Sequence, residues 1–479
     1  MNYRMILRIL GTVLLILAGL MLLPLIAGLW FGERLLCFIV PILLSAFIGA
    51  VMLLFKPRTT QIFAREGFVA VGLSWLMMSA IGALPFVISG DIPNYIDALF
   101  ETVSGFTTTG CTVVAEPEGM SRSVLFWRLF THWIGGMGVL VFLMAVMPMS
   151  GEHSMHIMRA EVPGPSVGKL VPRARTTARI LYMIYMGLTV LEALLLRLGG
   201  MSFYESVLNA FATAGTGGLS TRSASIASYD SLYIEMVIAT FMVLFAINFN
   251  LYFLILIGRA RDALKSEELH VFAVMVSAAI IAIAINIRPL YEGMGQAFRY
   301  SYFQVASIVS TTGFGTADFD AWPEFSKSIL LILMLIGGCA GSTSGGLKLS
   351  RVMIVVKAAA VEIKQMLRPR SVNRVQLDCK RISDSTIKAA NGYFVLYIMI
   401  ILVCALIVSV DGFDPATNFS ASLACMSNIG PGVSMVGPAC NYAGFSLFSK
   451  IVLSFEMLLG RLEIYALAIL FLPTTWKKN

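Results

Sequence analysis

Four short segments of this chain share one polar, glycine-centred pattern: Thr108-Thr109-Gly110-Cys111, Thr216-Gly217-Gly218-Leu219, Thr311-Thr312-Gly313-Phe314 and Asn428-Ile429-Gly430-Pro431. Each segment follows a short apolar stretch that begins about three helical turns upstream, and each precedes a long hydrophobic stretch. A pattern that repeats on this scale constrains the architecture more strongly than any single residue does. Four such loops in a membrane protein predict four walls around one cation pore.

The composition places the chain among membrane proteins. Hydrophobic residues make up 58% of the chain and charged residues 13%, which is unlike a soluble globular domain. The run from Ile6 to Ile26 resembles a secretory signal peptide, but a second apolar run from Leu36 to Phe55 follows with no A-x-A cleavage site between them. We therefore expect both runs to remain as an N-terminal helical hairpin.

The net charge of +8 is better explained by membrane topology than by binding to nucleic acid. Basic residues gather in alternate loops, whereas the loops beside the glycine-centred segments are acidic. Because Lys and Arg accumulate in cytoplasmic loops, the basic loops and both termini are expected in the cytoplasm, with the chain in a bacterial inner membrane. The basic residues are Lys56, Arg58, Arg159, Lys169, Arg173, Arg175, Arg179, Arg259, Arg261, Lys265, Lys357, Lys364, Arg368, Arg370, Arg374, Lys380, Arg381, Lys388, Lys477 and Lys478, and the acidic ones are Asp91, Asp97, Glu101, Glu116, Glu118, Asp318 and Asp320.

The apolar pattern predicts an all-α polytopic membrane protein with about ten transmembrane helices. After the hairpin, a unit of three parts repeats four times: an outward helix (M1), a short re-entrant half-helix (P) and a returning helix (M2). The expected domains are residues 1–60 for the hairpin and 61–150, 151–262, 263–375 and 376–479 for pore repeats one to four. The expected helices are 69–88, 94–107 and 125–147; 180–198, 203–215 and 232–257; 271–287, 297–310 and 329–356 with an interruption; and 393–410, 415–427 and 448–472.

The chemistry of the four loops suits a dehydrated monovalent cation. Backbone carbonyls can replace the water around such an ion, and glycine allows the positive φ angles that turn carbonyls inward. The C-terminal ends of the half-helices would point partial negative charge toward the ion. None of the four loops contains an acidic residue, so the pattern favours potassium over a divalent cation. One such cluster alone would favour a helix-packing sequence, but four in register favour a pore.

At these loops and at four further motifs, the chain resembles the TrkH/TrkG potassium-uptake subunits of the superfamily that includes KtrB and the plant HKT transporters. The resemblance covers nearly the full length. It implies four M1–P–M2 repeats around one pore, a homodimer, and regulation by a cytosolic nucleotide-binding ring similar to TrkA. The four motifs are Ser104-Gly105-Phe106-Thr107-Thr108-Thr109-Gly110, the stretch from Trp127-Arg128 through Trp133-Ile134-Gly135-Gly136-Met137-Gly138, Gly337-Gly338-Cys339-Ala340-Gly341-Ser342-Thr343-Ser344-Gly345-Gly346 and Leu459-Gly460-Arg461-Leu462-Glu463.

The resemblance also implies a selectivity filter and the ion that it prefers. The filter would lie at Thr108 to Gly110, Thr216 to Gly218, Thr311 to Gly313 and Asn428 to Gly430, with potassium bound there as the transported ion. Glycine in the first loop accompanies potassium preference in this superfamily and serine accompanies sodium transport, so Gly110 favours potassium. In the second loop Gly215, Gly217 and Gly218 lie close together, and the register stays open.

The third returning helix contains a glycine-rich interruption. Such a segment at membrane depth should line water or protein, because each interior glycine costs a helix about 1 kcal/mol relative to alanine. The resemblance implies a gate loop beneath the filter, formed by Gly337, Gly338, Gly341, Ser342, Thr343, Ser344, Gly345 and Gly346. Arg461 in the last apolar helix would be either a latch beside this loop or a structural ion pair with Glu456 or Glu463.

Other motifs carry weaker alternatives. Gly341 to Gly346 has the outer spacing of a phosphate-binding loop, but Leu347 occupies the position of its lysine. His132 could be a metal or proton-relay residue, although a packed polar contact is favoured. The cysteines are expected to be buried thiols, with a bridge between Cys425 and Cys440 as an alternative.

Three function classes follow from these observations. The leading prediction is a potassium-conducting pore subunit for uptake, controlled by a cytosolic partner. A secondary transporter that couples potassium to protons or sodium by symport is the alternative, although the repeats share one orientation and coupled transporters often use inverted repeats. An enzyme or scaffold is disfavoured, since no nucleophile–base pair, metal cluster or organic-cofactor motif occurs in the sequence.

Overall fold

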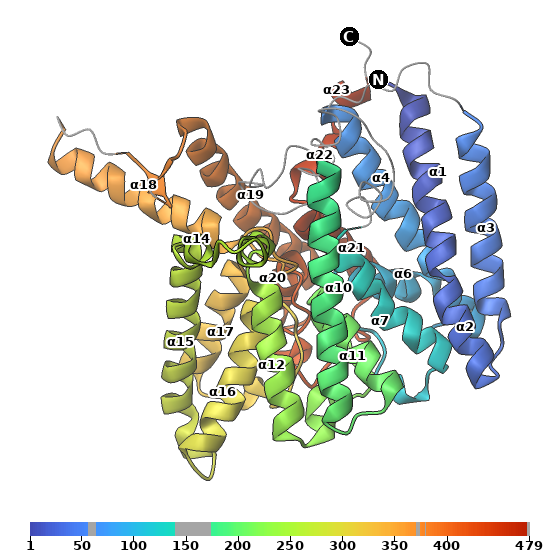
Figure 1. Cartoon of the computed structure of the whole chain (residues 1–479), viewed down its shortest axis with the longest axis horizontal. Coiled ribbons are helices and arrows are strands. Elements are labelled where there is room, and N and C mark those ends of the chain that lie inside the picture. Colours follow the sequence, from blue (N-terminus) through green and yellow to red (C-terminus); the bar gives the residue numbers. More distant parts are fainter. Residues whose placement is uncertain (56–63, 139–173, 370–373, 379, 477–479) are drawn as a thin grey trace.

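The computed structural model describes residues 1–55, 64–138, 174–369, 374–378 and 380–476, and these residues are almost wholly helical (Figure 1). An all-α polytopic architecture is therefore confirmed. Six described segments are long and apolar enough to cross a membrane on their own: Tyr3–Phe31, Leu36–Leu53, Arg65–Ser89, Thr176–Leu198, Glu267–Leu290 and Asp384–Asp411. A bent pair, Leu232–Ala246 with Phe249–Leu256, would make a seventh.

The N-terminal hairpin is present and lies against the first repeat. Helices α1 (Tyr3–Leu20) and α2 (Leu22–Phe31) run nearly end to end, and α3 (Leu36–Leu53) returns beside α1. The Ser45 hydroxyl of α3 donates to the Leu14 carbonyl of α1 at 2.7 Å. The Glu33 carboxylate accepts the first two N–H groups of α7 (Arg122–Gly136), at 2.7 and 2.9 Å, so it anchors the hairpin where that helix lacks its own acceptors.

The half-helices form close to the positions that the sequence predicts. In three of them the side chain at the N-terminal cap accepts a backbone N–H: Asn94, Ser202 and Asp414. The third has Gly293 at this position and no side-chain cap. Each is buried along most of its length, unlike the outward helices that precede it. The half-helices are α6 (Tyr95–Phe106), α11 (Phe203–Gly215), α16 (Met294–Val309) and α20 (Pro415–Ser427); the outward helices are α4 (Ala64–Gly82) continued by α5 (Leu84–Ser89), α10 (Ala174–Leu198), α15 (Glu267–Ile287) and α19 (Asp384–Val408).

Two of the returning helices are broken where the sequence predicts one continuous helix. The predictions of a single helix over 232–257 and over 448–472 are wrong. Helix α12 (Leu232–Ala246) ends before Asn248, whose side chain caps α13 (Phe249–Leu256), and the two helices meet at 92°. Helix α21 (Leu447–Arg461) ends where Glu463 and Ile464 both have φ near 55°, and α22 (Tyr465–Phe471) and α23 (Pro473–Trp476) follow. The predicted interruption of the third is confirmed, between α17 (Glu324–Ile336) and α18 (Leu349–Leu367).

One end of the molecule carries both termini and the projecting elements (Figure 1). The Tyr3 hydroxyl lies 3.4 Å from the Trp476 carbonyl oxygen, so the two ends of the described chain meet. Helix α18 extends away from the body, followed by the antiparallel strands β1 (Gln376–Leu377) and β2 (Lys380–Arg381), and α14 (Ala260–Leu264) lies at the same end. The end of the first returning helix and the basic residues Arg159, Lys169 and Arg173 lie outside the described residues.

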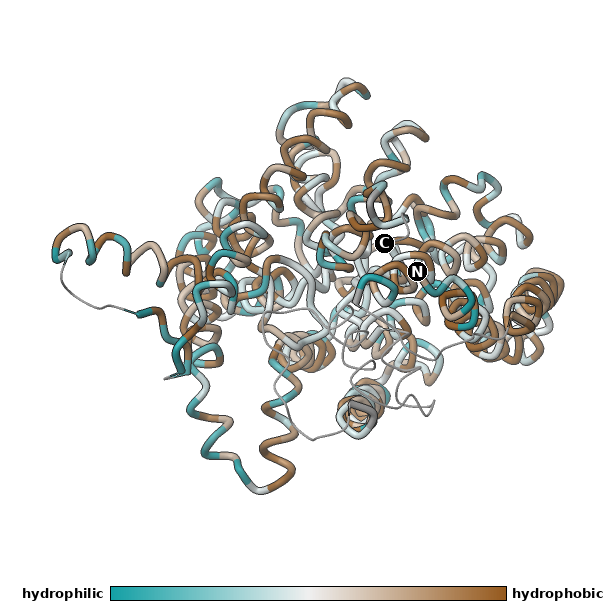
Figure 2. The backbone as a smooth tube through the Cα atoms, turned by 90° about the horizontal axis from the view of Figure 1, so that it is seen from above, coloured by the Kyte–Doolittle hydropathy of each residue, from teal (hydrophilic) through white to brown (hydrophobic). Residues whose placement is uncertain are grey.

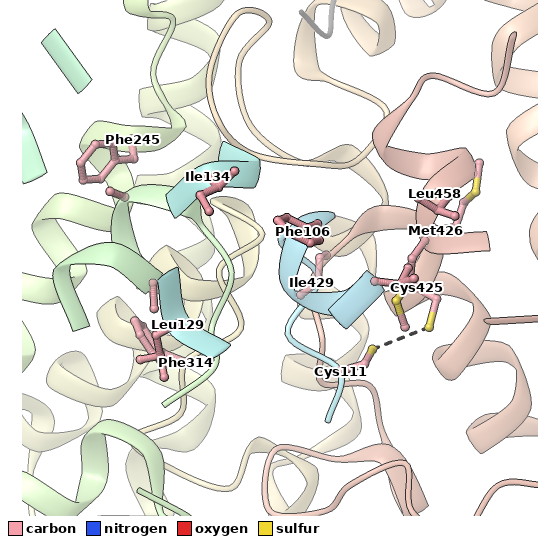
Figure 3. Close-up of a cluster of buried hydrophobic side chains, with 14 of the residues drawn as sticks. Phe106, Cys111, Leu129, Ile134, Phe245, Phe314, Cys425, Met426, Ile429 and Leu458 are labelled. Carbon is pink, nitrogen blue, oxygen red and sulfur yellow. Dashed lines mark hydrogen bonds between the residues drawn. The ribbon is translucent and has the colours of Figure 1, made fainter. Parts of the chain in front are cut away.

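The hydropathy of the chain changes from the periphery to the centre. Seen from above, hydrophobic stretches are frequent in the outer helices, although hydrophilic stretches interrupt some of them, whereas paler segments gather in the middle (Figure 2). Apolar side chains such as Phe106, Ile134 and Ile429 pack close to the glycine-centred loops (Figure 3). An apolar exterior around a more polar centre is the distribution expected of a protein that encloses a polar path through a membrane.

Candidate ion pathway

The four glycine-centred loops have the same backbone conformation. Each half-helix ends one or two residues before a residue in the left-handed region, and a glycine with positive φ follows two residues after that residue. The first position is Thr108, Thr216, Thr311 or Asn428, with φ of 56°, 55°, 58° and 54°, and the second is Gly110, Gly218, Gly313 or Gly430, with φ of 85°, 74°, 86° and 93°. Thr216-Gly217-Gly218 is thus the segment of the second loop that corresponds to the other three.

Successive loops contact one another through their glycines, and the contacts close into a ring. A β-carbon placed on Gly110 would overlap the Gly217 carbonyl oxygen, one on Gly218 would overlap that of Thr312, and one on Gly313 would overlap that of Ile429. One on Gly430 would lie 2.9 Å from the Thr109 carbonyl oxygen. The middle residue of each loop therefore places its carbonyl against the glycine of the preceding loop, in the order one to four and back to one.

Hydrogen bonds between side-chain hydroxyl groups stabilise the loops. Thr107 and Thr109 share a hydrogen bond of 2.7 Å between their hydroxyls, and Ser310 and Thr312 repeat it in the third loop at the same distance. In the fourth loop Asn428 takes the place of threonine, and its amide donates to the Thr109 hydroxyl at 2.9 Å. These hydrogen bonds join side chains to side chains and do not use the backbone carbonyls of the loops.

A buried ion pair supports the chain just after the first loop. Nε of Arg128 lies 2.6 Å from Oε1 of Glu101, with both side chains at most 2% exposed. The same guanidinium donates to the Ser220 carbonyl at 3.0 Å and to the Thr112 hydroxyl at 2.9 Å. Glu101 also accepts the Val113 N–H at 2.9 Å. Because Thr112 follows the first loop and Ser220 the second, the pair holds two adjacent loops together.

His132 forms a packed polar contact, as the sequence favours. Its Nδ1 lies 2.8 Å from the Gly105 carbonyl, which can only accept, so Nδ1 carries the proton. Its Nε2 then accepts the Leu219 N–H at 3.3 Å, immediately after Gly218. The neutral ring connects the first half-helix to the second loop. The described residues contain no group of three or more His, Cys, Asp or Glu side chains that could hold a metal ion.

A cavity of about 160 Å³ opens on one side of the ring. All four glycines of the ring line it, together with Arg128 and Arg222 among the described charged residues. Near its rim, burial acts to raise the pKa of the Glu118 carboxyl, but hydrogen bonds from the Ser223 N–H and hydroxyl outweigh it and hold that pKa below its ordinary value. Its lining includes Ala115 and Pro117, which lie between the first loop and the start of α7. Helix α7 starts beside Glu33, at the end of the hairpin away from the N-terminus (Figure 1).

The glycine-rich interruption lies against the opposite side of the ring. The Gly345 N–H donates to the Thr311 hydroxyl at 2.6 Å, and a β-carbon on Gly345 would overlap the Ser427 carbonyl oxygen. Nearer the start of the interruption, the Cys339 N–H donates to the carbonyl of Ala246, the last residue of α12, at 3.0 Å. The segment that contains Gly337, Gly338, Gly341, Ser342, Thr343, Ser344, Gly345 and Gly346 is therefore packed between the broken helix and the third and fourth loops.

Arg461 donates hydrogen bonds both to this segment and to the first returning helix. Its Nη1 donates to the Thr343 carbonyl at 2.8 Å, and its Nη2 donates to the Gly135 and Gly136 carbonyls at 2.6 and 2.8 Å. Glu463 pairs with Arg351 at 2.6 Å, and Glu456 accepts a hydrogen bond from Ser422. The sequence did not point to Lys348, which is buried beside the same segment and donates to Ser344.

Cys425, near the end of the fourth half-helix, lies beside Cys111 and not beside Cys440, the partner considered in the sequence analysis. The Cys425 thiol lies 3.6 Å from that of Cys111, whereas Cys440 is exposed (Figure 3). The alternative of a bridge between Cys425 and Cys440 is wrong: each of the six described cysteines is a free thiol. Sequence spacing could not reveal this contact because 314 residues separate the two thiols.

The half-helices bring their loops together below a polar cavity, and apolar helices surround them. This arrangement defines a polytopic membrane transport protein. The chain matches the model of the TrkH family, described as cation transport proteins, over residues 37–478. It is 34% identical to the Trk system potassium uptake protein TrkH of Salmonella typhimurium over 486 residues, which cover all of both chains. It is 32% identical to the Trk system potassium uptake protein TrkG of Escherichia coli over 464 residues, or 95% of each.

A solved structure agrees with these similarities. The crystal structure of the potassium transporter TrkH from Vibrio parahaemolyticus matches this chain with a TM-score of 0.89 and 33% identity, and the match covers all of both chains. The chain belongs to the TrkH family of cation transport proteins.

Proposed function

We propose that this chain is the potassium-conducting pore subunit of an uptake system. The observation that carries the proposal is the closed ring of four loops, each with its middle carbonyl against the glycine of the loop before it. A ring of backbone carbonyls can replace the hydration shell of a monovalent cation. The names of the relatives, Trk system potassium uptake proteins, support potassium as the ion.

The selectivity filter comprises Thr108 to Gly110, Thr216 to Gly218, Thr311 to Gly313 and Asn428 to Gly430. The hydroxyls of Thr109 and Thr312 and the amide nitrogen of Asn428 are engaged in hydrogen bonds with other side chains. We therefore assign the ion to the backbone carbonyls of the loops. The four half-helices end at the ring, and their C-terminal dipoles add negative potential there without a fixed carboxylate. This arrangement favours a weakly hydrated monovalent cation over a divalent one.

The gate is the glycine-rich segment from 337 to 346, held by Arg461. The segment contacts the third loop through Gly345 and Thr311, so its displacement would open the space directly beneath the filter. Arg461 joins it to Gly135 and Gly136 of the first returning helix and acts as the latch. The five glycines of the segment give it a backbone that can change conformation at small steric cost.

Opening is controlled by a cytosolic nucleotide-binding partner that docks at the end carrying both termini. Support comes from α18, which projects from the body with Lys364 and Arg368 exposed, beside the basic strand β2. The cytoplasmic position of this end follows from its basic loops. Assembly as a homodimer is a further prediction, which rests on the resemblance to the TrkH/TrkG subunits.

The test is potassium and sodium flux into liposomes that contain the purified protein, beside Gly110→Ser. The side chain at position 110 would meet the Gly217 carbonyl and would need φ near 85°, so it must disturb the ring. We expect flux that prefers potassium in the unchanged protein and admits sodium in the variant. The matched control is Gly119→Ser, because a β-carbon at Gly119 meets no atom within 4 Å.

Other outcomes are equally informative. Sodium-preferring flux in the unchanged protein would show that potassium is the wrong ion, but it would not contradict a pore formed by the four loops. Flux that requires a proton or sodium gradient would favour a coupled transporter instead of a channel. If no flux occurs, the Arg461→Ala variant, which lacks the latch, supplies a protein that should conduct without its cytosolic partner.

A further inference from the structure

Two free thiols lie in contact at the edge of the proposed filter. Cys111 follows Gly110 directly, and Cys425 lies in the last turn of α20, three residues before Asn428. Their sulfur atoms are 3.6 Å apart, and the two residues are 1% and 0% exposed. Figure 3 shows the two side chains pointing toward each other from the first loop and the fourth half-helix.

The Cys111 thiol also contacts the backbone of the ring. Its Sγ lies 3.5 Å from the Gly430 carbonyl oxygen, which can only accept, so the thiol is the donor. The same carbonyl accepts the Tyr442 hydroxyl at 2.8 Å. A change at the Cys111 sulfur therefore acts directly on a carbonyl of the fourth loop.

The cavity above the ring borders this pair, although the two sulfurs themselves are buried. The cavity of about 160 Å³ is lined by Gly110 and Thr112, the neighbours of Cys111 on both sides, and by Gly430 and Tyr442. The cavity opens at the end opposite the termini, which is the side that faces an oxidising compartment if the termini are cytoplasmic. Peroxide is neutral and similar in size to water, so it can enter where hydrated ions enter.

We propose that Cys111 and Cys425 form an oxidant-sensitive pair whose disulfide lowers ion flux; the effect on flux rests on the proposed function. The Cys111 sulfur attacks one peroxide oxygen, which yields a sulfenic acid and one water. The Cys425 sulfur then attacks the Cys111 sulfur and displaces a second water. Two thiols lose two electrons and two protons, and one hydrogen peroxide becomes two waters.

The disulfide changes the ring in two ways. It removes the S–H donor from the Gly430 carbonyl, and it draws the two sulfurs from 3.6 Å to the bonded distance of about 2.05 Å. The first loop and the fourth half-helix are thereby joined covalently beside Gly110 and Asn428. Because the loops touch in a closed ring, a shift at this joint displaces the carbonyls that face the ion.

The test uses the full chain in liposomes, treated with hydrogen peroxide and then with a thiol-capping reagent in denaturant. Peptide mass spectrometry should find Cys111 linked to Cys425, and potassium flux should fall by most of its value and return with dithiothreitol. Cys111→Ser and Cys425→Ala should each abolish the linked peptide and the peroxide effect. Cys440→Ser, at the exposed thiol that lines the same cavity, should keep both.

Several results would overturn the inference. One is oxidation of Cys440 with no peptide that links Cys111 to Cys425, since it shows that peroxide reached the cavity without effect on the pair. A link between Cys111 and Cys440 would also overturn it, and a Cys111–Cys425 link with unchanged flux would remove its functional part. Absence of potassium flux before oxidation, in the Arg461→Ala variant as well as in the unchanged protein, counts against the proposed function, while the linked peptide still decides whether the pair reacts.

Discussion

The side-chain amide of Asn428 donates a 2.9 Å hydrogen bond to the hydroxyl of Thr109, although 319 residues separate the two along the chain. The same amide nitrogen lies 3.0 Å from the Met457 carbonyl oxygen of α21. Asn428 occupies the position at which the other three loops have threonine, and asparagine tolerates the left-handed backbone conformation better than most residues. One side chain thus joins the last loop to the first and closes the ring.

Replacing Asn428 with alanine should reduce both stability and ion selectivity. The change removes both hydrogen bonds and leaves the buried Met457 carbonyl without this donor, at a cost of about 1–3 kcal/mol. We expect a lower temperature of thermal unfolding in detergent and a smaller ratio of potassium to sodium flux in liposomes. The control is Asn286→Ala, which removes a 2.9 Å bond to Ser326 between α15 and α17. Equal loss of selectivity in the two variants would contradict the assigned role of Asn428.

The sequence predicted the four loops and their half-helices because these features are local and repeat. Ranges such as 203–215 and 415–427 coincide with α11 and α20. An apolar stretch defines each half-helix, and a polar cap residue marks the start of three of them. The φ angles of Thr216 and Gly218 match those of the corresponding residues in the other three loops, a correspondence that no composition argument could supply.

The contacts between loops could not be predicted in the same way. The partners of Arg128, His132 and Cys111 lie in other repeats or across a loop, and a single sequence does not pair residues so far apart. The breaks after Ala246 and Arg461 were missed because each lies within a long, mostly apolar run. They are marked by the cap that Asn248 supplies to α13 and by the positive φ of Glu463 and Ile464, which composition alone does not indicate.

Removing one partner of the Glu101–Arg128 pair should destabilise the protein strongly. Glu101→Gln leaves the Arg128 charge buried without its carboxylate, which typically costs about 3–5 kcal/mol. The double variant Glu101→Gln with Arg128→Met should recover part of that loss, as measured by thermal unfolding. Glu324→Gln breaks the more exposed pair with Lys327 and should change stability by no more than about 1 kcal/mol. A double variant no more stable than Glu101→Gln alone would argue against an uncompensated charge as the cause.

Gly460 should not tolerate even alanine. A β-carbon at this position in α21 would overlap the Met426 carbonyl oxygen in the last turn of α20, so the two helices must separate. Overpacking of this kind usually costs about 1–3 kcal/mol, and we expect lower thermal stability together with altered potassium flux. Gly187→Ala is the matched control, because a β-carbon there meets no atom within 4 Å and alanine favours a helix interior by about 0.5–1 kcal/mol. Similar unfolding temperatures for the two variants would disprove the close contact.

Neutralising Arg461 should release the gate. Its guanidinium donates to the Thr343, Gly135 and Gly136 carbonyls, and hydrogen bonds from a charged group are each worth about 1.5–3 kcal/mol. Loss of even one such bond from the closed state alone would raise the open population about tenfold. Arg461→Ala should therefore show much higher potassium flux than the unchanged protein when no cytosolic partner is present.

Three further variants separate the latch from a structural charge. Arg461→Lys keeps the charge but cannot reproduce the planar fork of donors, so its flux should lie between those of the alanine variant and the unchanged protein. Arg197→Ala removes an arginine that donates to the Met201 carbonyl far from the gate, and it should leave flux unchanged. Glu463→Gln tests the ion-pair alternative, since a structural pair would make it resemble Arg461→Ala. If Arg461→Ala remains folded and its flux equals that of the unchanged protein, Arg461 is no latch and another contact must hold the segment beneath the ring.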